Sequence, residues 1–553
     1  MRASAKRWDY LILTAANAAQ AEAYRMQLGL RREAGTLGRF GDVLVIPDRE
    51  GRRIGSGGST IECLLELARR EAPDAARGSG TAALEAAFGR LRVLIVHAGG
   101  DSRRLPAYSA CGKIFVPLPA RERQALPATL FDRLVSIAVE LPPAPEGSGQ
   151  IVVTSGDALL LFDPSPVDFS RPGITALAAF AEPEEASRHG VFCPNPDGST
   201  RLYLQKPSLE EQRAQGAISP HGRTPLDIGV MSFDGAAAAA LLGVFCDPEN
   251  PAGPGWRQEM LQLVFAHGLD LYREICCAMG TGATREHYLR AARGSGSRWP
   301  DSALAGIYPS LHAIPMPAVV LDGCAFLHFG ATRQLIASGL TLAAYDAGAP
   351  PEGTVLTMTT AIGRGGLIRG ADSWVEGCRV RAPLVLGGNN AVTGLDVDEP
   401  LELPPGACLD LSPGVDRRGR RVWFVRCYGV NDTFKHPAAE GAEFCGMPLA
   451  EWLDAAGAAS EVWDEGVPEA ARTLWNARVF PAETDPARYR DWLWMFDAAR
   501  SGPARRRAFL AADRYSAAEI ALLVSQEAFH AGRLAIHSAG LACRTAAAER
   551  EFV

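Results

Sequence analysis

The segment LRVLIVHAGGDSRRLP, residues 91–106, predicts a buried β-strand that breaks into a Gly-Gly turn carrying an acid and two arginines. Glycines let a backbone approach a phosphate closely and point its N–H groups at it. Arg103 and Arg104 can neutralise phosphate oxygens, and Lys113 can swing onto a bridging or leaving oxygen. The alternative is an ordinary strand–turn–helix junction. Because Ile114 follows Lys113, the spacing is not that of a Walker A loop, and the P-loop class is excluded.

Around this segment, from the start of the chain to about residue 340, short apolar runs alternate with longer helical patterns. Strands are expected at residues 8–15, 42–47, 91–100, 150–157 and 175–182, and helices at residues 19–33, 60–72 and 128–141. This alternation predicts an α/β domain, residues 1–340, with a largely parallel sheet covered by helices on both faces. In such sheets the ligand lies at the carboxyl ends of the strands.

A different period begins near residue 355. Seven apolar residues then follow at a spacing of six, which is typical of the hexapeptide repeat of a β-helix and not of a helix or a flat strand. They are Leu356, Ile362, Ile368, Trp374, Val380, Leu386 and Val392. We therefore expect a short β-helix within residues 341–435, although Trp374 is large for its core. Hexapeptide β-helices often assemble, so a homo-oligomer is one expectation.

From about residue 440 the apolar residues recur at three- and four-residue spacing, which predicts an α-helical C-terminal domain, residues 436–553. Helices are expected at residues 448–456, 469–477, 487–500 and 516–535. Four tryptophans are expected in its core: Trp452, Trp475, Trp492 and Trp494.

Length and composition narrow the class of protein. A chain of 553 residues is too long for one core, so two to four domains are expected. A formal net charge of −7 argues against a general nucleic-acid or membrane-surface binder. The 12 cysteines include no CxxC pair, and no apolar run approaches the length of a membrane span. A cytoplasmic protein with reduced thiols fits these observations.

A second glycine-rich turn, GSGGST at residues 55–60, opens onto an amphipathic pattern. Consecutive free N–H groups at a helix N-terminus suit an anion or the edge of a base, so Gly57 and Gly58 are candidate nucleotide contacts. The alternative is a Ser/Thr cap on a surface helix. The turn also loosely resembles the phosphate loop of galactokinase-type kinases, but the preceding Pro and the paired serines of that loop are missing.

Three further positions extend the candidate site. Asp157 ends an apolar strand pattern, where an α/β nucleotide enzyme would hold Mg²⁺ by one or two carboxylates; the alternative is a helix cap. Only four of the 56 basic residues are lysines, and Lys206 precedes a proline, so an extended backbone with a far-reaching side chain is expected there. Asp227 and Gly229 lie on a predicted strand and suit sugar hydroxyls.

Several segments carry a resemblance that spans nearly the whole chain. They are residues 13–28 (LTAANAAQAEAYRMQL), 53–60 (RIGSGGST), 96–113 (VHAGGDSRRLP to GK), 326–334 (FLHFGATRQ), 428–435 (YGVNDTFK), 443–453 (EFCGMPLAEWL) and 473–481 (TLWNARVFP). Together they resemble the L-fucose-1-phosphate guanylyltransferase (GDP-L-fucose pyrophosphorylase) family, including the pyrophosphorylase half of the bifunctional fucokinase enzymes. The resemblance implies a Rossmann-like nucleotidyltransferase domain, a short left-handed β-helix and a helical C-terminal domain.

The resemblance also implies roles for individual residues. Gly99, Gly100, Asp101 and Arg103 would contact the nucleoside triphosphate, and Lys113 would be the catalytic lysine. Asp157 would be the metal ligand, Lys206 would contact the sugar phosphate, and Gly57 and Gly58 would lie near the base. The stretch AYSACG, residues 107–112, differs from the family's usual residues and receives no role.

The function expected from this resemblance is transfer of GMP from GTP to a sugar-1-phosphate, with β-L-fucose-1-phosphate favoured and Mg²⁺ as cofactor. GDP-fucose and pyrophosphate would be the products. The kinase half of the bifunctional enzymes is missing from the sequence, so free L-fucose should not be phosphorylated. Two alternatives stay open at this point: a sugar kinase that uses the GSGGST loop, and a non-catalytic nucleotide-binding scaffold.

Overall fold

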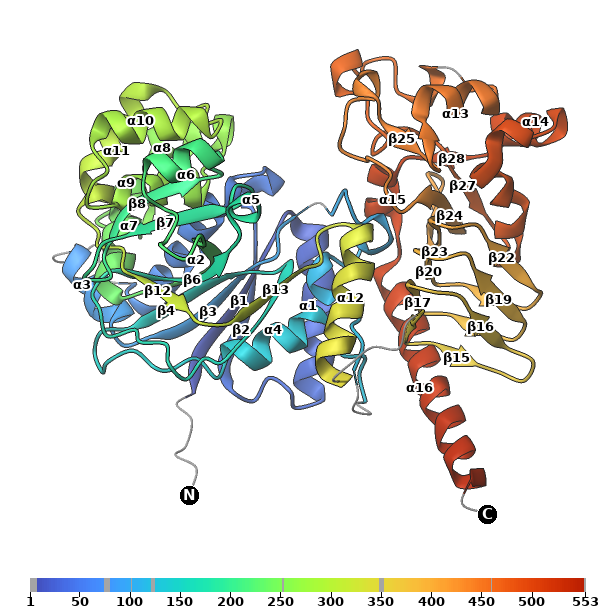
Figure 1. Ribbon diagram of the computed structural model, residues 1–553, viewed down its shortest axis with the longest axis horizontal. Coiled ribbons are helices and arrows are strands. Elements are labelled where there is room, and N and C mark those ends of the chain that lie inside the picture. The colour runs from blue at the N-terminus through green and yellow to red at the C-terminus, as the bar shows by residue number, and fades with distance from the viewer. Residues whose placement is uncertain are drawn as a thin grey trace. The chain divides into compact units, whose positions relative to one another are not determined.

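The chain folds into two compact units (Figure 1). The computed structural model describes residues 7–73, 80–100, 102–120, 125–250, 253–347, 353–458 and 460–551. The first unit holds residues 1–100 and 134–326, and the second holds residues 101–133 and 327–553. The segment that carries Arg103 and Lys113 therefore groups with the second unit. None of the helices in the described ranges is long and apolar enough to span a membrane.

A mixed sheet forms the centre of the first unit, and the strands expected from the sequence are all part of it. Its strands are β1 (Trp8–Ala15), β2 (Phe40–Pro47), β3 (Arg92–His97), β4 (Gln150–Ser155), β6 (Ile174–Ala181), β7 (Gly190–Pro194), β8 (Thr200–Gln205), β9 (Thr224–Phe233) and β12 (Ala318–Leu321). The spatial order is β12-β6-β9-β4-β3-β1-β2, and β7 pairs with both β8 and β9.

The strand directions modify the expectation of a largely parallel sheet. Strands β2, β1, β3 and β4 run parallel, and so do β6 and β12. Strand β9, however, lies antiparallel between β4 and β6. The apolar pattern of a buried strand predicts its position but not its direction, so this insertion was not foreseen.

Helices cover both faces of this sheet. The main ones are α1 (Ala18–Glu33), α2 (Gly55–Glu71), α3 (Gly80–Phe88), α4 (Leu130–Ala138) and α7 (Gly235–Phe245). Successive side chains of a strand point to opposite faces, and β4 shows both of them. Ile151 and Val153 belong to the core that α2, α3 and α7 cover. Val152 and Thr154 face α4 on the other side.

Shorter elements complete the first unit. They are η1 (Arg49–Gly51), β5 (Ala158–Phe162), α5 (Pro183–Ala186), α6 (Leu209–Ala214), β10 (Cys246–Asp247), β11 (Gly255–Trp256), α8 (Gln258–His267), the π-helix η5 (Leu271–Cys276), α9 (Cys277–Met279), α10 (Arg285–Gly294) and α11 (Asp301–His312). Helix α4 and strand β13 (Cys324–His328) cross the limits of the two units.

In the second unit the chain winds repeatedly through three stacks of parallel strands (Figure 1). The first stack contains β14 (Val355–Met358), β17 (Ser373–Glu376), β20 (Ala391–Thr393) and β23 (Ala407–Val415). The second contains β15 (Ala361–Ile362), β18 (Arg379–Val380) and β21 (Asp396–Val397), and the third contains β16 (Leu367–Arg369), β19 (Pro383–Leu386) and β22 (Leu401–Leu403). Each strand pairs with the strand of the same stack in the next winding.

The predicted period of six describes this region only in part. Leu356, Trp374, Val380, Leu386 and Val392 are buried, but Ile362 is 45% exposed and Ile368 is partly exposed, so these two are not core residues. The register pairs Trp374 with Ala391, and it pairs Val392 with the neighbouring Val375. Trp374 and Val392 therefore lie on opposite faces of their stack, because adjacent residues of a strand do. Trp374 packs against Gly339 of α12 (Thr332–Ala347), and this outward position explains how a side chain as large as tryptophan is accommodated.

The C-terminal part is helical only in part. Its helices are α13 (Leu449–Ala456), α14 (Pro503–Ala511), α15 (Ala517–Leu523) and α16 (Gln526–Glu551), with short 3-10 segments η6 (Ala438–Glu440), η7 (Ser460–Val462) and η8 (Glu469–Ala471) and a long one, η9 (Pro486–Arg500). Strands β24 (Arg421–Gly429), β27 (Phe480–Glu483) and β28 (Arg514–Tyr515) extend the first stack in antiparallel order, and β25 (Glu443–Phe444) pairs with β26 (Met447–Pro448).

Two expectations for this part can be compared with the structure. The expected helix at residues 469–477 is wrong, because Asn476 accepts hydrogen bonds from the N–H and the hydroxyl of Thr473 and holds a turn there. The expected core tryptophans, in contrast, are confirmed, since Trp452, Trp475, Trp492 and Trp494 are all buried.

Candidate functional site

The turn that follows β3 is held by two side chains of α1. The Gln20 amide bridges two strand ends: its oxygen accepts from the Ala16 N–H at 2.7 Å, and its nitrogen donates to the Gly100 carbonyl at 3.0 Å. The Tyr24 hydroxyl donates to the Ala98 carbonyl at 2.8 Å. These contacts fix the Gly-Gly turn at the carboxyl end of the sheet. Gln20 and Tyr24 were not singled out from the sequence, although both lie in a family-like segment.

The two glycines of this turn differ in their surroundings. A Cβ on Gly99 would come within 3.2 Å of the Ala15 carbonyl carbon, so the close approach of the two strand ends favours glycine there. A Cβ on Gly100 would meet nothing within 4 Å, which leaves space beside that residue. Both glycines lie at the strand ends where a nucleotide is expected. Asp101, the next predicted contact, lies outside the described residues.

The GSGGST turn forms the first turns of α2, and its expected free N–H groups are not free. The N–H groups of Gly57 and Gly58 both donate to the Leu269 carbonyl, at 2.8 and 3.1 Å. A Cβ on Gly57 would lie 2.9 Å from Leu269 Cγ. The glycines thus let α2 pack closely against the segment around Leu269. The prediction of free anion-binding groups was wrong because a sequence does not show which carbonyl will reach a glycine-rich turn.

The hydroxyls of α2 bind two titratable residues at the ends of β2 and β3. The Ser59 hydroxyl donates to Asp48 Oδ1 at 2.7 Å, and burial raises the pKa of Asp48 to about 6. Thr60 Oγ1 lies 3.0 Å from His97 Nε2 and donates to the Ser56 carbonyl. Thr60 therefore accepts a hydrogen bond from His97. Burial lowers the pKa of His97 to about 4, so this histidine is neutral at pH 7.

The end of β4 lies beside the middle of β9, which brings two predicted residues, Asp157 and Asp227, into one neighbourhood. The Ser155 hydroxyl donates to Asp157 Oδ1 at 2.9 Å. Gly229 has a φ of 76°, which favours glycine, and its Cβ position would lie 3.7 Å from both Ser155 Cβ and the Tyr272 hydroxyl oxygen. The register of β6 with β9 shifts beside this glycine, so β9 forms a bulge in its middle.

Asp227 is buried and has a protein partner on each carboxylate oxygen. Its Oδ1 accepts from the Gly229 N–H at 2.7 Å, and its Oδ2 accepts from the Tyr203 hydroxyl at 2.8 Å. Burial raises the pKa of Asp227 to about 6. The ring of Tyr203 stacks on Tyr272 of the π-helix with ring centroids 6.5 Å apart. This environment fits an anchor for the bulge, and a direct role of Asp227 with sugar hydroxyls stays a prediction.

Lys206 follows β8 and has a backbone conformation that the sequence argument did not expect. Its φ is 54°, in the left-handed region, whereas the following proline predicted an extended backbone. The Lys206 N–H donates to the His189 carbonyl at 2.9 Å, which holds this turn. The side chain is exposed. A lysine whose backbone lies in the left-handed region is uncommon, and such strained residues gather at functional sites.

In the second unit, Arg103 and Lys113 lie on the two sides of a buried stretch. The 3-10 turn η3 (Pro106–Tyr108) follows Arg103, and a second turn, η4 (Lys113–Phe115), begins at Lys113. Both basic side chains are partly exposed, whereas all six residues of the AYSACG stretch between them are buried. The stretch left without a role in the sequence is therefore a packed element.

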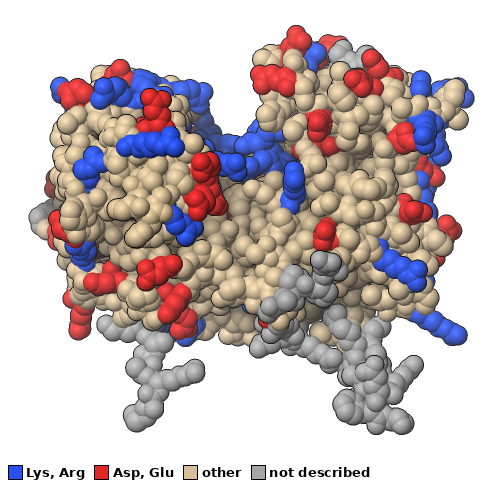
Figure 2. Space-filling view, viewed as in Figure 1, with Lys and Arg blue, Asp and Glu red and all other residues tan. Residues whose placement is uncertain are grey.

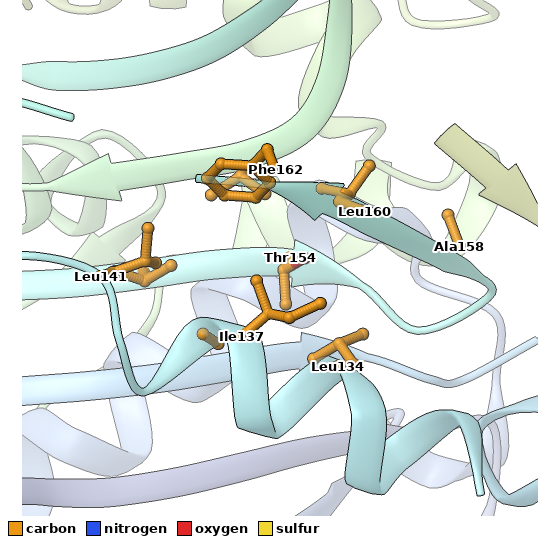
Figure 3. Close-up of a pocket in the computed structure, with 10 residues that line it drawn as sticks. Leu134, Ile137, Leu141, Thr154, Ala158, Leu160 and Phe162 are labelled. Carbon is orange, nitrogen blue, oxygen red and sulfur yellow. The ribbon is translucent and has the colours of Figure 1, made fainter. Parts of the chain in front are cut away.

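An apolar cavity lies between α4 and the sheet of the first unit (Figure 3). It is lined by Leu134, Ile137, Ala138, Leu141, Val152, Thr154, Ala158, Leu160, Phe162 and Val230. Figure 3 shows Leu134 and Ile137 on α4, and Leu141 in the segment after it, facing β4 and β5. Because this lining has no charged side chain, the cavity does not suit a phosphate.

On the face of the first unit seen in Figure 2, acidic and basic side chains are interspersed.

Comparison with known proteins identifies the family. The family described as "Fucose pyrophosphorylase domain" matches residues 86–485, which is well over half of the chain. The chain belongs to this family. Its matched region includes the turn after β3, Asp157, Lys206, Asp227 and the parallel stacks of the second unit.

Individual relatives agree with this family. A bifunctional fucokinase/GDP-fucose pyrophosphorylase of Arabidopsis thaliana is 29% identical over 538 residues, which cover 89% of this chain and 49% of that protein. A Bacteroides fragilis L-fucokinase/L-fucose-1-P guanylyltransferase is 24% identical, with 74% and 40% covered. The chain thus spans about half the length of these two relatives or less. A mouse fucose-1-phosphate guanylyltransferase is 25% identical, with 86% of this chain and 83% of the relative covered.

Proposed function

We propose that this protein transfers GMP from GTP to β-L-fucose-1-phosphate, giving GDP-L-fucose and pyrophosphate. The observation that carries this proposal is the match to the mouse fucose-1-phosphate guanylyltransferase, which covers most of both chains. The family match over residues 86–485 supports the same reaction class. In the structure, Gly100 has space beside it after β3. Ser155, which binds Asp157 at the end of β4, lies beside Gly229, which binds Asp227.

The proposed reaction is an in-line displacement at the α-phosphorus. A phosphate oxygen of the sugar-1-phosphate forms the new P–O bond, the bond between the α-phosphorus and its bridging oxygen breaks, and pyrophosphate leaves with that electron pair. Positioning and charge neutralisation supply the catalysis in such transfers, so basic residues have the main roles. We assign Lys113 and Arg103 to the departing pyrophosphate and Lys206 to the sugar phosphate.

The remaining assignments follow the same proposal. Gly99, Gly100 and Asp101 are assigned to the nucleotide, and Asp227 with Gly229 to the sugar side. Gly57 and Gly58 remain assigned to the vicinity of the base, but through packing of α2, because their N–H groups are used by Leu269.

Mg²⁺ is the proposed cofactor, and Asp157 is the residue that would hold it. The fit rests on its donor chemistry: a partly exposed carboxylate at a strand end, oriented by Ser155, offers the hard oxygen that Mg²⁺ prefers. Among the described residues no three His, Cys, Asp or Glu side chains are placed to share a metal. We propose that the ion is bound by this carboxylate and by substrate phosphates, where it would neutralise phosphate charge.

The finer description of the fold is also a proposal. We infer a Rossmann-like nucleotidyltransferase domain in the first unit and a short left-handed β-helix in the parallel stacks of the second. The three-stack winding with pairings 16 to 18 residues apart supports the second inference. A cytoplasmic location and a homo-oligomer remain predictions. The eleven cysteines from Cys63 to Cys445 are free thiols.

The test is a substrate panel. The purified chain is incubated with Mg²⁺, each of the four NTPs and a set of sugar-1-phosphates, and pyrophosphate release is measured. We expect release with GTP and β-L-fucose-1-phosphate. Incubation with free L-fucose and ATP tests the kinase alternative in parallel, because a sugar kinase would release ADP. Occupied N–H groups at Gly57 and Gly58 argue against it, because a phosphate loop needs them free.

A further inference from the structure

The buried stretch between Arg103 and Lys113 is anchored inside the second unit by a chain of polar contacts. Tyr108, at its centre, is completely buried. The Tyr108 hydroxyl accepts a hydrogen bond from the Trp374 indole N–H at 2.9 Å and donates to Glu376 Oε2 at 3.3 Å. Both partners lie on β17 of the first parallel stack. The stretch is thereby tied to a strand more than 260 residues later in the chain.

The far side of Glu376 is held by the C-terminal helix. Both carboxylate oxygens of Glu376 lie 3.1 Å from the Nε of Arg533 on α16. Glu376 has no exposed side-chain surface, and the Arg533 side chain is only 11% exposed. The Arg533 guanidinium also lies over the ring of Phe529, 3.5 Å from its centroid. A buried carboxylate of this kind is stable only with its cation in place.

Helix α16 contacts the same stretch at a second point. The Gln526 amide nitrogen, at the start of α16, donates to the Ala110 carbonyl at 2.9 Å. Figure 1 shows α16 (red) running along the stacked strands of the second unit, and its contacts with β15 and β23 agree with this. The stretch 107–112 is thus fixed from β17 through Tyr108 and from α16 through Ala110. Lys113 follows directly after it.

We propose that Tyr108, Glu376, Arg533 and Gln526 are positioning residues for Lys113, with α16 acting as a brace for the loop that carries it. None of them would touch substrate; they would act by fixing the backbone from which the Lys113 side chain projects. The inference rests on the proposed function for its catalytic consequence, but the anchoring itself concerns only the second unit. It gives the parallel stacks and the C-terminal helix a part in the reaction.

The test uses Tyr108→Phe, which keeps the ring and removes the bridging hydroxyl. Its matched control is Tyr515→Phe, because Tyr515 is equally buried in the second unit and its hydroxyl accepts one hydrogen bond, from the Arg417 N–H. We expect Tyr108→Phe to lower kcat about tenfold or more with little change in the KM values, since misplaced catalytic groups lose this much rate. Tyr515→Phe should leave kcat unchanged at a similar loss of Tm.

Hydrogen–deuterium exchange provides a readout that needs no activity. Amides of residues 105–116 should exchange about tenfold faster in Tyr108→Phe and in Gln526→Ala than in the wild type, because local opening becomes easier. Tyr515→Phe should not change them. Unchanged exchange in both variants would overturn the anchoring, and equal kcat losses in both tyrosine variants would overturn the positioning role. If the wild type releases no pyrophosphate, the proposed function fails while the exchange result still decides the anchoring.

Discussion

Lys206 carries the clearest backbone strain of the predicted site residues. A residue with a Cβ at a φ of 54° is disfavoured by about 1–3 kcal/mol, and such residues gather at functional sites. The N–H contact with the His189 carbonyl holds the turn, but it does not require a lysine side chain. The exposed ammonium is therefore what needs an explanation, and the proposed contact with the sugar phosphate supplies one.

Lys206→Gly should separate stability from activity at this position. Glycine accepts the left-handed φ, so we expect the free energy of unfolding to rise by about 1 kcal/mol. Lys206→Ala keeps the strain and should change stability little. Both variants lose a charged contact and should lower kcat/KM for the sugar-1-phosphate by about 10- to 100-fold. Urea unfolding and pyrophosphate release measure the two effects; normal kinetics in Lys206→Gly would refute the assignment.

Asp227 should give the protein a specific pH dependence. Burial raises its pKa from 3.8 to about 6 in the folded protein, so the folded state binds a proton more strongly than the unfolded state. Its contribution to the free energy of unfolding should therefore fall as pH rises from about 4 to about 6 and then level off, by about 3 kcal/mol in total. Asp227→Asn lacks this titration. The difference between the two proteins in urea unfolding at pH 4.5 and 7.5 measures it, and a difference independent of pH would contradict it.

At the scale of elements, the glycine-rich start of α2 is compatible with two roles, anion binding and close helix packing. The GSGGST turn has the composition of an anion site, but its glycines bring α2 against the Leu269 carbonyl. Two N–H groups of the first turn of α2 are thereby satisfied within the protein. The hydroxyls of Ser59 and Thr60 at this edge orient Asp48 and His97.

Gly57→Ala should be destabilising because its Cβ would lie 2.9 Å from Leu269 Cγ and 3.0 Å from the Leu269 carbonyl oxygen. We expect a loss of about 1–3 kcal/mol, as for other overpacked sites. Gly29→Ala is the matched control within α1, where a Cβ meets nothing within 4 Å. That change should stabilise the protein by about 0.5–1 kcal/mol. Thermal unfolding of both variants is the measurement, and equal Tm values would rule out the packing role.

The first parallel stack carries a buried polar row that no sequence period reveals. Glu376, Thr393 and Asp410 face one another across β17, β20 and β23, and all three are buried. Asp410 pairs with Arg426 on β24 at 2.7 Å, and Glu376 pairs with Arg533. Each acid in this row therefore has its own arginine from a later element. Such pairing makes the stack depend on the chain that follows it.

At the scale of the whole molecule, this dependence ties the C-terminal helix to the fold of the second unit. A chain ending at Ser525 would lose Arg533, the cation of Glu376, together with the buried Phe529 and Ile536, so we expect a cost of about 3–5 kcal/mol or more. A chain ending at Thr545 keeps Arg533 and Gln526 and should unfold like the full-length protein. Chemical unfolding of the two truncations measures the difference; equal stability would show that α16 is not a brace.

Individual elements show which parts of the fold could be predicted from the sequence. The strands at 8–15 and 42–47 and the helix at 19–33 were predicted closely, because each has a strong apolar period and clear boundaries. The helix at 469–477 failed, since a side-chain hydrogen bond at Asn476 holds a turn there. Asp157 and Asp227 were singled out from the sequence, and their roles stay predictions, whereas Gln20, Tyr24 and Tyr108 were not singled out.

The sequence by itself determined the family and the first strands and helices of the first unit, because periodicity and short motifs are local properties. Only the tertiary structure decided that β9 runs antiparallel, that the Gly57 and Gly58 N–H groups are already used, that Trp374 faces α12, and that Arg533 neutralises Glu376. Each of these depends on which distant group a backbone or side chain meets after folding. The strand and turn at residues 91–106 were readable locally; the brace behind Lys113 required the folded chain.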